Sequence, residues 1–474
     1  MNMSAPESNP KFAWRELAQK GPPRRSVKER VSDFLEVYGI YDEETAREQA
    51  SRCIQCPNPT CVQGCPLCNP IPQWMQLTAE GRFLEAAGVL GSTTNLAEIC
   101  TRCCPSDHLC EHQCILDGIT EPVAINAIEQ FLVEYAFKHG QINLATPPPN
   151  GRKVAVVGSG PGGLAAAEEL AGKGYAVTIF DAGLLPGGLL VDGTPTFRVE
   201  RSIVQRRIDV LQKRGVKFQL GRKLGDNLAL SDLRSGFDAV YLGFDSRKSH
   251  PLQIPGANLK GVVQALPFLL QKTTPVSLDL PAIDLNGKRV VVIGAGDTAM
   301  DCLRAALRWG AKEATCVYRR EATEMPCSKH SFQDAVDEGA RFEFRSAPVA
   351  ILGTGSVTGI KLLRTEPAAP EVDGRRSFQP VPGSEYDIEA DWIVPALGFD
   401  PVPCPHHDDL SALSTNAWGG IVVNSMMMSS IEGVFASGDI VNGPAMLLNT
   451  VRDARKAAQF IHAYLCAKKT AGAT

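Results

Sequence analysis

Two glycine-rich turns constrain the fold of this chain more than any other feature. GSGPGG at 158–163 follows the apolar run 154–157, and GAGDTA at 294–299 follows the apolar run 290–293. In each case an alanine-rich helical pattern comes next, and then a second apolar run. A strand, a Gly-rich turn and a helix leading to a parallel strand form the unit that binds a dinucleotide pyrophosphate. Two such units predict two dinucleotide-binding domains rather than one large sheet.

The first turn has the residues that this chemistry requires. Gly158 allows a tight turn, Gly160 lets the backbone approach a pyrophosphate, and Gly163 lets the helix pack closely on the strand. The N-terminus of the helix then presents free N–H groups and a positive dipole end to the phosphates. Asp181 ends the second apolar run, where its carboxylate can accept hydrogen bonds from ribose hydroxyls. The alternative is a glycine turn that serves packing alone.

A second acidic residue near the C-terminus predicts a flavin site. The run 434–437 is typical of a strand, Gly438 and Asp439 end it, and a helix is expected from about Leu447. Asp439 can bond a ribityl hydroxyl of a flavin, and the helix N-terminus can face the isoalloxazine ring. The alternative for Asp439 is a turn or N-cap residue. Flavin reductases with two dinucleotide sites follow this plan, in which the nicotinamide domain interrupts the flavin domain.

The second turn indicates NADP(H). The residues expected to contact this dinucleotide are Gly294, Gly296, Asp297 and Thr298. The next strand, 314–318, ends in Arg319 and Arg320 instead of an acid. Guanidinium groups bind a 2′-phosphate, which a carboxylate would repel. The alternative is that both arginines form a solvated surface pair.

Cysteines are concentrated before the first turn. Ten of the fifteen lie between residues 53 and 114, in the order Cys53, Cys56, Cys61, Cys65, Cys68, Cys100, Cys103, Cys104, Cys110 and Cys114. Structural zinc sites typically use two short CxxC-type pairs for each metal, and this spacing resembles instead the cysteine runs that hold iron–sulfur clusters. A flavin reductase also gives a redox cluster a purpose. Two iron–sulfur clusters are therefore favoured over zinc, packing or disulfides.

The motifs together resemble the small (β) subunit family of NADPH-dependent glutamate synthase over nearly the whole chain. They also resemble the N-terminal module of dihydropyrimidine dehydrogenase and the large subunit of NADH-dependent ferredoxin:NADP oxidoreductase. The motifs that carry the resemblance are PPRRSVKERVSDFLEVY, RCIQCPNPTCVQGCPLCNPIPQWMQLTAEGRFLEAA, CPSDHLCEHQC, GSGPGGLAAAEEL, LPGGLL with Gly188, VVVIGAGDTAMDC, CVYRREATEMP, ALGFDP and FASGDI.

The resemblance implies ligands for two interleaved 4Fe–4S clusters. The first cluster would use Cys53, Cys56, Cys61 and Cys114. The second would use Cys65, Cys104, Cys110 and a fourth ligand that need not be a cysteine. That fourth position aligns with Glu129, although the adjacent Gln130 remains open. Cys68, Cys100 and Cys103 are then surplus, and the simplest interpretation is that they are buried free thiols near the clusters.

The resemblance also implies a fold and an activity. We expect an α/β chain with an N-terminal α-helical iron–sulfur domain and two Rossmann-like domains in a glutathione-reductase-like arrangement. The expected domains are 1–146 for the clusters, 147–285 with 394–474 for FAD, and 286–393 for NADPH. NADPH would reduce FAD, and the clusters would pass electrons to a large glutamate synthase (α) subunit that supplies glutamine hydrolysis and the 2-oxoglutarate site. The alternative is a reductase subunit for ferredoxin or a dihydropyrimidine-type partner.

Bulk composition excludes several other classes. The chain of 474 residues exceeds one hydrophobic core, and its formal net charge of −4 does not suggest a nucleic-acid or anionic-membrane partner. No secretory signal and no apolar run of about 18 residues is present, so no membrane span is expected. A cytoplasmic location is therefore expected, where clustered cysteines are more often metal-binding or catalytic than disulfide-bonded.

Overall fold

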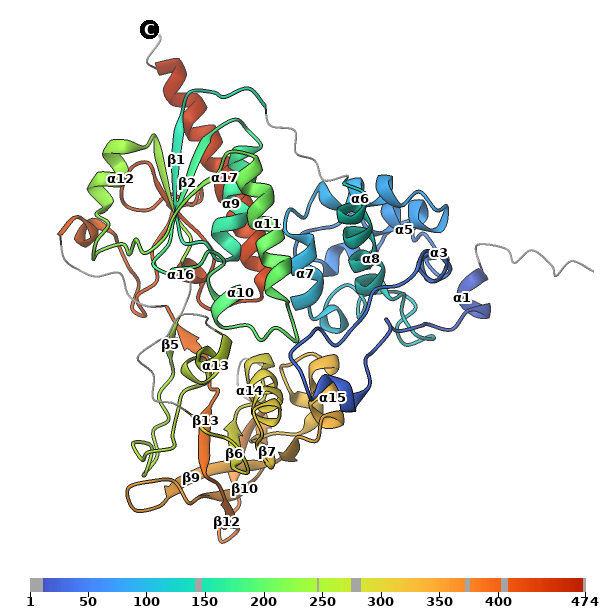
Figure 1. Cartoon of the computed structure of the whole chain (residues 1–474), viewed down its shortest axis with the longest axis vertical. Helices are drawn as coiled ribbons and strands as arrows, with labels where there is room; N and C mark the ends of the chain where they lie inside the picture. The colour runs from blue at the N-terminus through green and yellow to red at the C-terminus, as the bar shows by residue number, and fades with distance from the viewer. Residues whose placement is uncertain are drawn as a thin grey trace, which may run out of the picture.

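A computed structural model describes residues 12–140, 147–244, 247–273, 283–370, 376–401 and 408–471. Figure 1 shows three lobes: a helical lobe from the first quarter of the chain and two lobes built on sheets. The C-terminal helix returns to the first sheet lobe. Within the described residues no helix is long and apolar enough to cross a membrane.

The helical lobe contains six main helices. They are α3 (Glu43–Ser51), α4 (Thr60–Gly64), α5 (Ile71–Ala79), α6 (Phe83–Gly91), α7 (Ala97–Cys103) and α8 (Ile125–Lys138), with the short α1 (Ala13–Glu16), α2 (Val27–Arg30) and η2 (Ser106–His108) beside them. The helical pattern of 71–90 divides into α5 and α6 because Gly81, with φ +78°, ends the first of them. Trp74, Phe83 and Phe131 fill the core of this lobe.

The first sheet is parallel and contains the C-terminal strand. Its order is β15-β4-β1-β2-β3, formed by Val434–Ala436, Ala239–Leu242, Lys153–Val157, Ala176–Phe180 and Lys217–Gln219. The helices of this lobe are α9 (Pro161–Ala171), α10 (Leu189–Asp192), α11 (Arg201–Lys213), α12 (Leu230–Gly236), α16 (Asp439–Asn442) and α17 (Leu447–Ala471). Because β15 pairs with β4, the intervening chain forms an insertion, as the sequence predicted.

The inserted lobe repeats the plan with fewer strands. Its parallel sheet has the order β13-β6-β7-β8, formed by Trp392–Pro395, Arg289–Ile293, Glu313–Val317 and Arg341–Glu343. An antiparallel sheet contains β9 (Ser346–Leu352), β10 (Gly359–Pro370), β11 (Arg376–Pro380) and β12 (Tyr386–Glu389). The polar, turn-rich segment 363–387, which is typical of a hairpin or a loop, contains the hairpin of β10 and β11, with 371–375 outside the described residues. The remaining elements of the chain are the helices α13 (Ala265–Thr273), α14 (Asp297–Arg308), α15 (Lys329–Asp337), η3 (Ala322–Glu324) and η4 (Asp408–Ala412), and the strands β5 (Lys248–Ser249) and β14 (Phe399–Asp400), which pair with each other.

The parallel sheets of the two sheet lobes, with their helical crossovers, confirm the predicted fold class.

An N-terminal strap, residues 24–38, links the helical lobe to the inserted lobe. The Arg30 guanidinium is fully buried and lies 3.1 Å from the carboxylate of Asp334 and 3.3 Å from that of Glu338. At the other end of the strap, Glu36 pairs with Arg102 of α7 at 2.6 Å. The strap therefore fixes the inserted lobe against the helical lobe, and Figure 1 shows its course between them.

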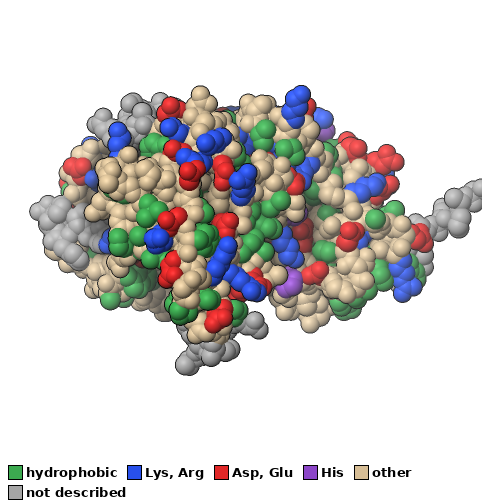
Figure 2. All heavy atoms as spheres, turned by 90° about the horizontal axis from the view of Figure 1, so that it is seen from below, with side chains coloured by type: hydrophobic (Ala, Val, Ile, Leu, Met, Phe, Trp, Pro, Cys, Tyr) green, Lys and Arg blue, Asp and Glu red, His purple; other side chains and the backbone are tan. Residues whose placement is uncertain are grey.

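A buried ion network joins the helical lobe to the first sheet lobe. Arg207 of α11 donates to both carboxylate oxygens of Glu98 of α7, at 2.6 and 2.8 Å, and also to Glu168 of α9. On the surface seen in Figure 2, by contrast, Lys and Arg alternate with Asp and Glu without a continuous patch of one sign. The charged side chains on this face are therefore mixed in sign, whereas those of the Arg207 network join two lobes.

Candidate functional site

The first Gly-rich turn cannot accommodate side chains at two of its glycines. Gly158 has φ +103°, and an added Cβ there would lie 2.7 Å from the carbonyl oxygen of Gly243. A Cβ on Gly163 would lie 1.8 Å from the carbonyl oxygen of Gly158. Gly160 is the N-cap of α9, so the first turn of that helix opens at the glycines. The turn thus has the bare backbone that a pyrophosphate requires.

Asp181 is held against this turn. It follows β2, and its carboxylate accepts hydrogen bonds from the N–H and the Oγ of Ser159, each at 2.6 Å, and from the N–H of Gly183 at 2.7 Å. Gly188, with φ +55°, is the N-cap of α10 at the same end of the sheet. The predicted ribose contact therefore lies beside the predicted pyrophosphate site.

The C-terminal motif reaches the same place from the far end of the chain. Gly438 has φ +73°, and Asp439, the first residue of α16, accepts a hydrogen bond from Thr450 Oγ1 at 2.9 Å. A Cβ on either Gly438 or Gly162 would meet the Cγ2 atom of Thr450, at 3.0 and 3.2 Å. The first turn of α17 therefore packs against both glycine turns, which brings together segments almost 300 residues apart in the sequence.

Gly163→Ala is expected to abolish FAD retention without unfolding the helical lobe. The new Cβ must displace the Gly158 carbonyl, and the turn that is predicted to bind the pyrophosphate moves with it. The measurement is the flavin content of the purified chain, from its visible absorbance, beside circular dichroism. Gly88→Ala on α6 is the matched control, because a Cβ there meets nothing within 4 Å. Equal flavin content in both variants would contradict the assignment.

The second Gly-rich turn has the same construction in the inserted lobe. Gly294 has φ +122°, and its Cβ would lie 2.4 Å from the carbonyl oxygen of Ala396. Gly296 is the N-cap of α14, and Asp297 and Thr298 form its first turn. Asp297 accepts a hydrogen bond from Arg198 of the first sheet lobe at 3.0 Å. That contact ties this turn to the first sheet lobe.

The two arginines follow β7, which ends one residue earlier than the sequence predicted. The Arg319 guanidinium lies over the ring of Phe378 on β11, 4.4 Å from its centroid. The Nε of Arg320 is buried and has no hydrogen-bond partner among the described residues. Sequence reasoning missed Phe378, because only the β10–β11 hairpin brings it to Arg319.

Four cysteines of the predicted first cluster line one cavity. Cys53, Cys56, Cys61 and Cys114 surround it, and apolar side chains, among them Met75 and Ile125, complete the wall. Burial raises the pKa of the Cys53 thiol to about 11 and that of Cys61 to about 12. These thiols therefore stay protonated until a metal displaces their protons.

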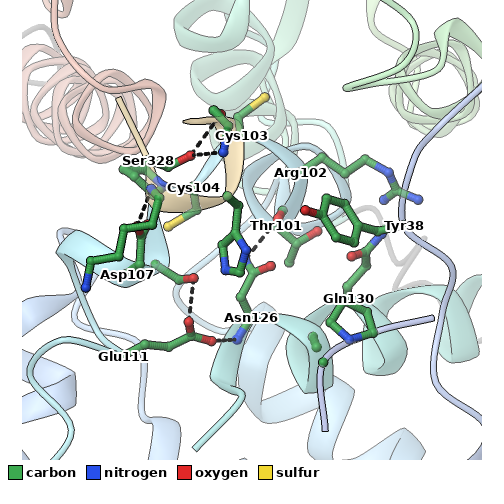
Figure 3. A pocket seen from close by; sticks show the side chains of 18 of the residues that line it. Tyr38, Thr101, Arg102, Cys103, Cys104, Asp107, Glu111, Asn126, Gln130 and Ser328 are labelled. Atoms are coloured by element: carbon green, nitrogen blue, oxygen red, sulfur yellow. Dashed lines mark hydrogen bonds between the residues drawn. The ribbon is translucent and has the colours of Figure 1, made fainter. Parts of the chain in front are cut away.

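The predicted ligands of the second cluster line a separate cavity. Cys65, Cys104, Cys110 and Glu129 all reach it, together with Leu448 of α17. Burial, reinforced by Glu111, raises the pKa of Glu129 to about 8. Gln130, the other open position, lies instead in a different cavity with Tyr38 and Arg102, shown in Figure 3. The geometry thus brings Glu129, and not Gln130, to the three thiols.

Each cavity has a volume of about 20 Å³, and its donors stand around the wall. Across the described residues, no group of three or more His, Cys, Asp or Glu side chains is arranged to hold one metal ion. A 4Fe–4S cluster takes one protein ligand at each iron, so its ligands surround a space and do not meet at a point. Four predicted donors around each of two separate cavities therefore match the number of ligands that two such clusters take.

Sequence reasoning missed two residues of the second cavity. Leu448 comes from the C-terminal helix, and no sequence signal links it to the cysteines. Cys100, counted as surplus, lines this cavity as well. Its spacing of four residues from Cys104 is the signal that was available, since such residues share a helix face. Cys103 is half-buried and lines the cavity of Figure 3, whereas the expectation of a buried thiol is wrong for Cys68, which is exposed.

Two family profiles match the chain. Residues 30–141 match the dihydropyrimidine dehydrogenase domain II, 4Fe–4S cluster family, and residues 152–458 match the pyridine nucleotide-disulphide oxidoreductase family. Among solved structures, Mycobacterium tuberculosis FprA in complex with NADPH has a TM-score of 0.58 at 22% identity, covering 68% of this chain and 86% of that chain. This likeness shows that the two chains share a fold over most of their length.

Several relatives match almost end to end. The glutamate synthase [NADPH] small chain of Azospirillum brasilense is 40% identical, with 96% of each chain covered. That of Escherichia coli K12 is 37% identical, with 96% of this chain and 98% of the relative covered. The putative oxidoreductase UacF of the same organism is 36% identical over 93% of this chain and 71% of its own length. At this identity and coverage, the chain belongs to the family of NADPH-dependent glutamate synthase small chains.

Proposed function

We propose that this chain is the electron-input subunit of glutamate synthase. It takes electrons from NADPH through FAD and two 4Fe–4S clusters and passes them to a large subunit, which makes glutamate from glutamine and 2-oxoglutarate. The observation that carries the proposal is the second cysteine cavity, which Leu448 of α17 also lines. The first turn of that helix packs against both turns of the flavin cleft, so the cavity adjoins the flavin side of the molecule.

Each cluster and each nucleotide has its own set of binding residues in this proposal. The first cluster is held by Cys53, Cys56, Cys61 and Cys114, and the second by Cys65, Cys104, Cys110 and Glu129. FAD is bound by Gly158, Gly160, Gly163, Asp181, Gly188, Gly438 and Asp439. NADPH is bound by Gly294, Gly296, Asp297, Thr298, Arg319 and Arg320. Support comes from the two cavities with their separate donors and from the bare backbone at both Gly-rich turns.

The bound flavin supplies the conversion of a two-electron donor into single electrons that clusters accept. The chain itself positions and shields the reactants. Its lobes are joined by the buried Arg207 network and by the strap, which holds the spacing of the sites constant. No side chain is needed as an acid or base for hydride transfer.

Two measurements test this function. Iron and acid-labile sulfide in the purified chain should be stoichiometric, and zinc without sulfide would refute the electron-transfer role. In complex with its natural large subunit, the chain should oxidise NADPH when glutamine and 2-oxoglutarate are supplied. A lack of stimulation would instead favour a second candidate, a reductase for another redox partner, which the 36% identity to putative oxidoreductases also supports.

Arg319→Ala should shift the nicotinamide preference. Loss of a charge-assisted bond to the 2′-phosphate, worth about 1.5–3 kcal/mol, lowers kcat/KM for NADPH by roughly 10- to 100-fold. NADH lacks that phosphate, so its kcat/KM should stay within about 2-fold. Arg341→Ala on β8 is the matched control, because this exposed arginine pairs with Glu313. An equal loss of kcat/KM for both nucleotides would show that Arg319 does not bind the 2′-phosphate.

A further inference from the structure

The second cysteine cavity contains one more donor than a cluster can use. Its wall includes four thiols and a carboxylate, contributed by Cys65, Cys100, Cys104, Cys110 and Glu129. A 4Fe–4S cluster takes four protein ligands, one for each iron. The first cavity differs, because among the described residues that line it there are four cysteines and no acid. The surplus therefore belongs to the second site alone.

Cys100 is positioned as a ligand would be. It lies on α7 with 2% of its surface exposed, and it forms no disulfide. The N–H of Cys104 donates to the Cys100 carbonyl at 2.8 Å, so helical spacing continues up to Cys104. Residues four apart share one face of a helix, which directs both thiols to the same cavity. Cys103, between them, lines the cavity of Figure 3 instead.

The donors of this cavity are close enough to interact electrostatically. The Cys100 thiol interacts with Glu129 on α8 and with Cys65, and Cys104 interacts with the same two groups. Either Glu129 or Cys100 therefore completes a set of four donors with the thiols of Cys65, Cys104 and Cys110. Soft thiolates are the preferred ligands of iron in clusters, and a carboxylate is a harder and weaker donor.

We propose that Cys100 is an alternative fourth ligand of the second cluster. The site then exists in a carboxylate-ligated form and in an all-thiolate form, an inference that rests on the proposed function. In the exchange, the iron loses one Glu129 oxygen and gains the Cys100 sulfur. The thiol proton of Cys100 passes to the released carboxylate, so the charge of the cavity is unchanged and no electron is transferred.

The test compares four forms of the full-length chain: wild type, Glu129→Ala, Cys100→Ser and the double variant. The readouts are iron, acid-labile sulfide and the electron paramagnetic resonance spectrum of the reduced chain. Each single variant should keep the full iron and sulfide content, and Glu129→Ala should change the spectrum because a sulfur replaces an oxygen at one iron. The double variant should lose about half of the iron and sulfide.

A second double variant, Glu129→Ala with Cys103→Ser, controls for general damage. It removes a half-buried thiol of the same helix that lines a different cavity, so it should match Glu129→Ala in iron content. If Glu129→Ala alone loses half of its iron, or if the Cys100 double variant keeps all of it, Cys100 is not a ligand. Wild-type protein without iron and sulfide would refute the proposed function itself, which separates the two failures.

Discussion

Cys114→Ala is expected to interrupt electron output while leaving the reduction of flavin by NADPH intact. The first cavity contains four cysteines, and no fifth thiol or acid among the described residues lines it. The loss of one ligand therefore removes the cluster. Glutamine-dependent NADPH oxidation with the large subunit should then fall by about 100-fold or more, because the flavin has lost a one-electron carrier between itself and the partner.

The flavin signal separates this effect from misfolding. In stopped-flow mixing with NADPH, the flavin absorbance of Cys114→Ala should bleach as fast as in the wild type. Cys68→Ser is the matched control, since this thiol lies in the same region but is exposed. It should retain its clusters and its output. Undiminished output from Cys114→Ala would remove the first cluster from the electron path.

Arg207→Ala should be the most destabilising single change at the contact between the lobes. Glu98 is fully buried, and Arg207 bonds it through two nitrogens while also bonding Glu168. Removal of one partner leaves buried carboxylates uncompensated, which costs about 3–5 kcal/mol. Because Glu98 and Cys104 belong to the same helical segment, the reduction of the clusters by NADPH should also slow. Urea unfolding followed by circular dichroism measures the first effect, and stopped-flow absorbance measures the second.

The neighbouring arginine provides the comparison. Arg206 forms two 2.8 Å bonds to Glu134 across the same contact, but 27% of its side chain is exposed. Solvent compensates for the loss of such a pair, so Arg206→Ala should cost only about 1 kcal/mol. If the two variants unfold at the same urea concentration, burial of the Arg207 network does not contribute the expected stability.

The sequence predicted the parts of this protein that depend on short segments. The turns at Gly158 and Gly294 could be read because a strand, bare backbone and a helix must follow one another to bind a phosphate. The insertion within the first sheet lobe was also predictable, because Gly438 and Asp439 end an apolar run typical of a strand near the C-terminus. The apolar residues of 71–90 have helical spacing and do form helices, which Gly81 divides into two through its positive φ.

Side-chain neighbours from distant segments were beyond reach of the sequence. Phe378 meets Arg319 only because the β10–β11 hairpin brings it to the residues after β7, and Leu448 meets the second cysteine cavity only because α17 returns to the first sheet. Likewise, the resemblance aligned Glu129 with the fourth ligand but left the adjacent Gln130 open. The rotation of α8 sends adjacent residues to different sides, which places Glu129 beside the thiols and Gln130 in another cavity.

The sequence by itself determined which residues are candidates for the chemistry of this chain: two Gly-rich turns for dinucleotides, cysteines for clusters and two arginines for a phosphate. These are local properties, because the required residue types and spacings lie within one turn or helix. Only the tertiary structure decided which thiols share a cavity, which acid joins them, and that Cys100 stands among them. Those choices depend on how α7, α8 and α17 pack, and packing is set by contacts between residues far apart in the chain.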